Sequence, residues 1–321
     1  MKPRHLLSSD ELHAEPNRAA PRSVLLPFII CTAIWGSTWI VITGQLGPVP
    51  PQWSVTYRFA IAAVAMAGLA TWKGESLNLG RRGLLVAAFL GFNQFCINFN
   101  AVYIAERHIT SGVVATVFAL LLIPAALLGW LWLGHRPSKR FAWSSLVAVA
   151  GIALLFVHEL QEHPADTRQI ASGIALTLAG MLGAAVANVA QARPEIRRFP
   201  LLALLAWSMA AGAIIDGTIA FAMTGPPVFD PRPSYWLGVL YLSLFASVLT
   251  FSLYYPMVRR IGPGKAAYSS VFVPIIAMGF STWLEHYRWT GIAVAGAVLA
   301  LGGMAAALAK DRSGVAAPDA A

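Results

Sequence analysis

The segment VLLPFIICTAIWGSTWIVIT, Val24–Thr43, contains no charged side chain. A helix of this length, rising 1.5 Å per residue, crosses the hydrocarbon core of a bilayer, which is about 30 Å thick. Similar apolar runs recur along all 321 residues, of which 57% are hydrophobic and 12% are charged. A soluble domain would carry about twice that charged share. The sequence therefore predicts an all-α polytopic membrane protein, with the lipid bilayer as its solvent.

Ten transmembrane helices are predicted, separated by polar turns and by proline and glycine clusters such as Gly47–Pro51. They are expected at residues 24–43, 53–72, 83–105, 109–134, 141–157, 170–191, 201–224, 235–258, 266–284 and 289–309. The polar residues 1–23 and 310–321 are expected to be disordered tails. The tail is too mixed in charge for a signal peptide, and the first run is longer than a signal h-region, so we expect that helix to be retained.

The basic residues alternate from loop to loop. The tails and the even-numbered loops hold most of the 23 Lys and Arg residues. The exceptions are Arg107, Arg168, Arg232 and Arg288 in the odd-numbered loops, and Arg58 within a helix. Because cytoplasmic loops carry an excess of Lys and Arg, both termini are predicted to be cytoplasmic. The net charge of +9 then reflects topology, and no nucleic-acid partner is expected.

The two halves of the chain repeat one another. Residues of the fourth helix recur at an offset of 150, where Gly112, Pro124, Gly129 and His135 match Gly262, Pro274, Gly279 and Glu285. Because five crossings is an odd number, the second copy must enter the membrane from the opposite side. The sequence therefore predicts two inverted five-helix repeats, residues 24–158 and 170–309. This architecture is typical of secondary transporters whose site lies between the repeats.

Four segments resemble EamA-type members of the drug/metabolite transporter superfamily, and the resemblance extends from Val24 to Leu308. They are WGSTWIVITGQLGPVPPQWSVTYRF (Trp35–Phe59), NFNAVYIAERHITSGVVATVFALL (Asn98–Leu121), LGHRPSKRFAWSSLVAVAGIALLF (Leu133–Phe156) and RRIGPGKAAYSSVFVPIIAMGFSTWLEHYRWTGIAVAG (Arg259–Gly296). The resemblance implies a carrier that moves, often outward, a small metabolite, amino acid or drug-like solute, without ATP or a cofactor. The expected location is the plasma (inner) membrane of a bacterium. His135 departs from the family pattern, which has Glu there.

Polar residues on two helices predict a substrate path between the halves. The third helix carries Asn93, Gln94, Asn98 and Asn100, and the eighth carries Ser243, Ser247, Thr250 and Tyr254. In this part of the repeat the offset is 152, because Phe99 and Tyr103 match Phe251 and Tyr255, and it aligns Thr250 with Asn98. The candidate substrate-binding residues on these helices are Asn93, Asn98, Ser247, Thr250 and Tyr254. The alternative is that these groups are hydrogen-bonding glue between helices.

Two tryptophans and two buried charges complete the candidate site. Trp35 and Trp39 share one helix face and could stack on a ligand, or pack against small neighbours. Arg58 and Asp216 are the only ionisable residues of the Asp, Glu, Lys, Arg or His kinds within the predicted spans, and both lie nearer the outer edge. Arg58 is expected to attract an anionic substrate group, with Asp216 as its counter-ion or as a proton-coupling site. The alternative is that Arg58 snorkels to the headgroups.

Other functional classes fit less well. Cys31 and Cys96 lie within apolar runs and have no metal-ligand spacing, so neither a metal nor a cofactor is expected. The predicted spans lack the converging acids and bases of an enzyme. A receptor or scaffold would leave the inverted repeat unexplained. The sequence leaves open uptake in place of export, and whether the chain forms a homodimer.

Overall fold

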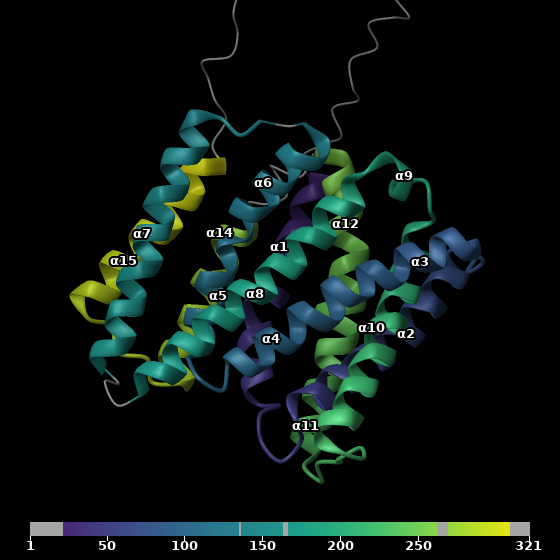
Figure 1. Cartoon of the computed structure of the whole chain (residues 1–321), viewed down its shortest axis with the longest axis horizontal. Coiled ribbons are helices and arrows are strands. Elements are labelled where there is room, and N and C mark those ends of the chain that lie inside the picture. The colour runs from purple at the N-terminus through teal and green to yellow at the C-terminus, as the bar shows by residue number, and fades with distance from the viewer. Residues whose placement is uncertain (1–21, 135, 163–165, 262–268, 309–321) are drawn as a thin grey trace, which may run out of the picture.

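The computed structural model describes residues 22–134, 136–162, 166–261 and 269–308, and the regular elements in these ranges are all helices (Figure 1). In chain order they are α1 (Arg22–Thr43), α2 (Pro51–Trp72), α3 (Gly80–Leu90), η2 (Gly91–Ile97), α4 (Asn98–Ala105), α5 (Ser111–Phe118), η3 (Ala119–Leu121), α6 (Leu122–Leu133), α7 (Lys139–Glu162), α8 (Thr167–Ala192), α9 (Pro194–Arg197), α10 (Leu201–Thr224), α11 (Pro233–Ser243), η5 (Leu244–Leu249), α12 (Thr250–Ile261), α14 (Ser269–Leu284) and α15 (Gly291–Leu308).

The predicted fold class is confirmed. The described residues contain nine helices that are long and apolar enough to cross a membrane, together with a shorter apolar helix, Val271–Leu284. Three of the crossings consist of successive helical segments that together form one continuous helix. They are α3–η2–α4, α5–η3–α6 and α11–η5–α12. Residues 1–21 and 309–321, His135 and Gly262 lie outside the described residues, so the expectations for them stay predictions.

Each half of the chain contains a π-helix at the same place in the repeat. The segment η2 ends at Ile97, directly before Asn98, and η5 ends at Leu249, directly before Thr250. Asn98 and Thr250 are the residues that the sequence repeat aligns. A π-helix bonds i to i+5 and adds about one residue to a turn, so it rotates the side chains before it relative to those after it.

The two prolines that the repeat aligns, Pro124 and Pro274, have different local backbones. Pro124 has no N–H to bond the carbonyl of Leu120, and the 3₁₀ turn Ala119–Leu121 lies just before it. Pro274 lies inside α14, which stays helical from Ser269 to Leu284. A 3₁₀ turn therefore precedes the proline in the first half, whereas the described helix around Pro274 in the second half is α-helical.

Corresponding helices of the two halves pack against each other. The fifth helices, α7 and α15, form a pair at one edge of the molecule, and the second helices, α2 and α10, form a pair at the other (Figure 1). Between these pairs, α1 packs on α14 of the second half, and α8 packs on α4, α5 and α6 of the first. This exchange places the interface of the two halves at the centre of the bundle.

The two ends of the bundle are distinguished by their loops. We call the end that carries loops 73–79 and 193–200 the basic end, because it holds Lys73, Arg193, Arg197 and Arg198. The opposite end carries loops 44–50, 106–110, 225–232 and 285–290.

Candidate functional site

A pocket lies between the halves, with about 970 Å³ of space that no atom fills. We call it the central pocket. The first half contributes side chains from α1, α2, η2, α4, α5 and η3, and the second half from α8, η5, α12 and α14. Its walls are mostly aromatic and aliphatic, as in most small-molecule sites.

The pocket ends at a buried floor. Ile42 is 1% exposed and Val102 is 3% exposed. Ile42 is the last residue but one of α1, whose C-terminus lies at the opposite end of the bundle. Towards the basic end, the lining residues Tyr254 and Asn188 are partly exposed. Ser269, the first residue of α14, also lines this part. The pocket is therefore closed at the opposite end.

Four buried polar atoms in the pocket lining have no hydrogen-bond partner among the described residues. Two are donors, Trp39 Nε1 and Arg58 Nη1, and two are acceptors, Gln94 Oε1 and Asn98 Oδ1. A buried polar group without a partner costs about 1–3 kcal/mol. Groups of both kinds facing one cavity are therefore suited to a ligand that carries both an acceptor and a donor.

Arg58 brings a positive charge to this wall. Its side chain is 1% exposed, and Nε and Nη2 each donate to Ser247 Oγ at 3.3 Å. The guanidinium carbon lies 4.4 Å from the centre of the Phe99 ring and 5.1 Å from that of Phe59. Rings and a hydroxyl orient the cation without neutralising it, so its charge remains available to an anionic group.

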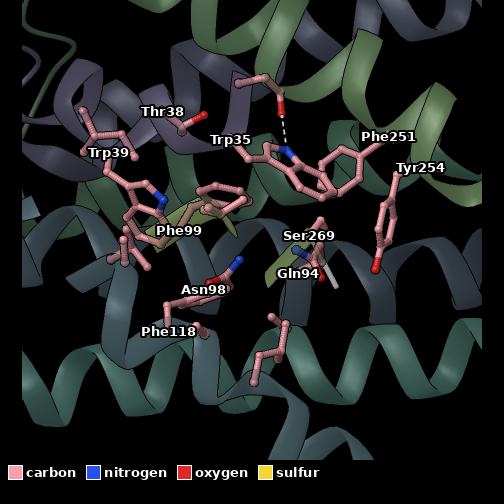
Figure 2. Close-up of a pocket in the computed structure, with 18 of the residues that line it drawn as sticks. Trp35, Thr38, Trp39, Gln94, Asn98, Phe99, Phe118, Phe251, Tyr254 and Ser269 are labelled. Atoms are coloured by element: carbon pink, nitrogen blue, oxygen red, sulfur yellow. Dashed lines mark hydrogen bonds between the residues drawn. The ribbon is translucent and has the colours of Figure 1, made fainter. Parts of the chain in front are cut away.

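Aromatic rings frame the polar atoms (Figure 2). Trp35 donates from Nε1 to the Ala246 carbonyl at 3.3 Å, and its ring lies 4.9 Å from that of Tyr254. Trp39 lies 5.5 Å from Phe118, ring centre to ring centre. In Figure 2 Trp35 and Trp39 lie above Asn98 and Gln94, so an apolar body could pack on these rings while its polar groups reach the amides.

The structure brings together some of the predicted site residues. Trp35, Trp39, Arg58, Asn98 and Tyr254 all line the central pocket. Their roles toward a substrate stay predictions.

Three other predicted residues lie outside the lining of the central pocket. Thr250 donates to the Ala246 carbonyl at 2.7 Å, and Asn93 Nδ2 donates to the Phe89 carbonyl at 2.9 Å. Ser247 donates to the Leu242 carbonyl at 2.8 Å and accepts from Arg58, so it acts on the pocket through that side chain. The bonds of Thr250 and Asn93 each reach a carbonyl four residues back in the same helix, so they differ from the hydrogen bonds between helices that the alternative expected.

Asp216 also lies outside the pocket lining. It is 0% exposed, and Oδ1 accepts from Asn100 Nδ2 at 2.6 Å, which joins α10 to α4. The expected salt bridge with Arg58 is absent from the part of the chain that the structure describes. The two side chains have different partners, Ser247 for Arg58 and Asn100 for Asp216. The prediction of a resting ion pair is therefore corrected.

Gln94 is the pocket residue that the sequence argument missed. A wheel of 100° per residue treats the third helix as regular, but Gly91–Ile97 is a π-helix. Gln94 faces the pocket, whereas Asn93 does not. The glycine at Gly91 is a signal that could have been noticed, because a Cβ there would overlap the Ser208 carbonyl of α10. Thr38, Phe118 and Asn188 were also missed, and no sequence pattern marks them.

Comparison with known proteins identifies the same two halves. A profile of the EamA-like transporter family matches residues 22–157 and again residues 171–309. Among solved structures, one crystal structure is similar with a TM-score of 0.65 and 18% identity, over 89% of this chain and 96% of that one. At this identity the likeness shows the fold alone.

Three curated bacterial proteins are similar over most of their length. "Uncharacterized inner membrane transporter YedA" of Escherichia coli K12 is 27% identical over 78% of this chain and 79% of its own. Protein PagO of Salmonella typhimurium is 20% identical over 83% and 86%. A "Probable amino-acid metabolite efflux pump" of Escherichia coli K12 is 23% identical over 86% and 91%.

Proposed function

Because this chain belongs to the EamA-like transporter family, a family of membrane transporters and not of enzymes, we propose that it is a secondary transporter that exports a small solute by alternating access. One observation supports this most strongly. The central pocket lies between the two halves, and rocking one half against the other would expose it to each side in turn.

The proposed solute carries an anionic group, a hydrogen-bond donor and an apolar body. Arg58 and Trp39 offer donors to a carboxylate, while Asn98 and Gln94 offer acceptors to an amine. The aromatic walls suit an apolar side chain. An amino acid or a related metabolite has this combination. The name of the similar efflux pump supports both this solute class and the outward direction.

We also propose the orientation of the protein in the membrane. The basic end, where α1 begins and α15 ends, faces the cytoplasm, because Lys and Arg concentrate in its loops. The bacterial inner membrane is the proposed location, and the name of the relative YedA supports it. The central pocket in this structure would then be closed toward the outside.

Comparison of cells with and without the protein tests this function. Extracellular metabolites are quantified for cells that overexpress the chain and for cells from which its gene is deleted. Export predicts that one or a few amino-carboxylates rise outside the overexpressing cells. A rise inside the cells instead would indicate uptake. Identical metabolite profiles would favour a receptor or scaffold and contradict the proposal.

A further inference from the structure

A buried carboxyl group lies beyond the pocket floor, at the opposite end. Glu106 is the first residue after the Gly80–Ala105 span and is 7% exposed. Its Oε2 lies 3.1 Å from Thr43 Oγ1, at the end of α1, and its Oε1 has no hydrogen-bond partner among the described residues. The Thr43 hydroxyl also lies 3.3 Å from the Trp39 carbonyl, and its one proton can serve only one acceptor at a time.

The surroundings of Glu106 disfavour its charged form. Glu285, at the end of α14, interacts with it as a second acid and accepts from the backbone N–H and the hydroxyl of Ser111. The C-terminal end of α4 adds negative potential. Arg58 interacts with Glu106 and favours its charged form, and the buried Tyr103 interacts electrostatically with both residues. Burial raises the pKa of Glu106 well above its usual range, although Thr43 and Arg58 oppose this shift.

The contact between Thr43 and Glu106 joins the end of α1 to the end of α4, beyond the pocket floor. Thr43 follows the floor residue Ile42, and Glu106 lies one helical turn beyond the floor residue Val102. Nearby, α5 packs closely on α14, because a Cβ on Gly112 would overlap the side chains of Met278 and Ser281. Side chains of both halves therefore meet in one layer between the pocket and the solvent at this end.

We propose that Glu106 is a proton-binding site of this carrier and that the bound proton keeps the pocket closed at the opposite end. Protonated Glu106 can donate from its O–H to Thr43, while Thr43 donates to the Trp39 carbonyl. When this proton is lost to water, Glu106 becomes a buried carboxylate that interacts with Glu285. Among the described residues, Thr43 is the only hydrogen-bond donor to it. Opening the contact hydrates this carboxylate. The inference adds a second ligand, the proton, to the proposed function and does not depend on which solute is carried.

The sign of the pH effect follows from this site. The closed form holds a proton at pH values where a solvated glutamic acid, with a pKa of about 4.3, has lost it. Raising the pH above that value therefore favours the open form, until Glu106 is ionised in both forms. Opening is expected to increase about tenfold for each unit by which the pKa of Glu106 in the closed form exceeds that of the open form.

Labelling of the pocket floor tests the inference without any solute. Ile42→Cys is introduced into a Cys31→Ala, Cys96→Ala background and treated with a membrane-impermeant maleimide between about pH 5 and about pH 8. Intact cells and inverted vesicles expose one face each, and His286→Cys reports which face is the opposite end. Rates are divided by those of His286→Cys, which corrects for thiol ionisation. Labelling of Ile42→Cys from the face at which His286→Cys reacts is expected to rise at least about tenfold over this pH range.

Variants of the acids decide the assignment. With Glu106→Gln, labelling should stay low and independent of pH, since a neutral amide replaces the protonated acid. Glu106→Asp should retain a pH-dependent rise, which also covers the case that Glu106→Gln does not fold. Glu75→Gln is the matched control, because Glu75 binds the backbone N–H groups of Leu202 and Ala203 in α10. A rise in Glu106→Gln equal to that of the parent, or no rise in the parent, would overturn the inference.

Discussion

Arg58 is a buried cation held by the hydroxyl of Ser247 and by the ring of Phe99. Asp216 has an independent partner, because it accepts from Asn100 on another face of the bundle. Removing Arg58 therefore changes the pocket, whereas removing the charge of Asp216 changes contacts of α10 with α4 and η2, outside the pocket lining. The two residues should contribute to transport by separate routes.

A double-mutant cycle measures that separation. Arg58→Gln should reduce transport of the identified solute by more than about tenfold, since a hydrogen bond to a charged group contributes about 1.5–3 kcal/mol. Asp216→Asn should retain most of the transport, because an amide can still accept from Asn100. In the double variant the two effects should add within about 0.5 kcal/mol. A larger coupling energy would mean that the two charges do interact during the cycle.

Individual site residues were predictable where the backbone is regular. Trp35 and Trp39 lie four residues apart in α1, a helix without a π segment, and both reach the pocket. The prediction placed Asn93 in the pocket in place of Gln94, because it did not include the rotation of side chains by the π-helix η2. The Ser and Thr stripe of the eighth helix was predicted as a stripe, but a sequence does not show whether a hydroxyl bonds a ligand or its own helix. Thr250 and Ser243 bond backbone carbonyls.

At the scale of helices, glycine determines which pairs pack closely. A Cβ on Gly151 of α7 would overlap the backbone of Ala300 and Gly296 in α15, and a Cβ on Gly303 would overlap Ala148 and Ser144 of α7. Gly302, the neighbour of Gly303, has open space around its Cβ position. Neither α7 nor α15 contributes a side chain to the lining of the central pocket. This pair supports the bundle and does not touch the proposed solute.

Valine at these glycines should therefore affect folding and not the pocket. Gly151→Val is expected to destabilise the protein by about 1–3 kcal/mol, the usual effect of overpacking. Gly302→Val, the matched control, should change stability by less than about 0.5 kcal/mol. The measurements are thermal unfolding in detergent and transport per folded molecule. Transport per folded molecule should stay unchanged in both variants, and a specific loss in Gly151→Val would place α7 in the transport mechanism.

At the scale of the whole molecule, hydropathy and loop charge predicted the ten helices, and the internal sequence repeat predicted the two halves. These signals work because the bilayer fixes the length of each span and sorts the basic loops. The packing of α1 on α14 and of α8 on the first half was not predictable in the same way. Contacts between helices depend on the shapes of many small side chains. The order of the spans in the sequence does not show which helices pack together.

The orientation of the molecule is open to a direct test. Glu195 in a basic-end loop and Arg288 in an opposite-end loop are both exposed. In the background without Cys31 and Cys96, Arg288→Cys should react with an impermeant maleimide on intact cells. Glu195→Cys should react only after the membrane is permeabilised. The reverse pattern would invert the proposed topology, and labelling of both sites on intact cells would contradict the alternation of the loops.

The central claim is that one pocket between two halves carries a solute across the membrane, and counterflow in proteoliposomes tests it most directly. Vesicles loaded with unlabelled solute are diluted into labelled solute, and uptake is followed over time. A carrier predicts a transient accumulation of label above its equilibrium level. Asn98→Ala, which removes a lining acceptor without a partner among the described residues, should reduce this accumulation by about tenfold or more at unchanged folded yield. Label that only equilibrates, or an Asn98→Ala variant with undiminished counterflow, would contradict the account.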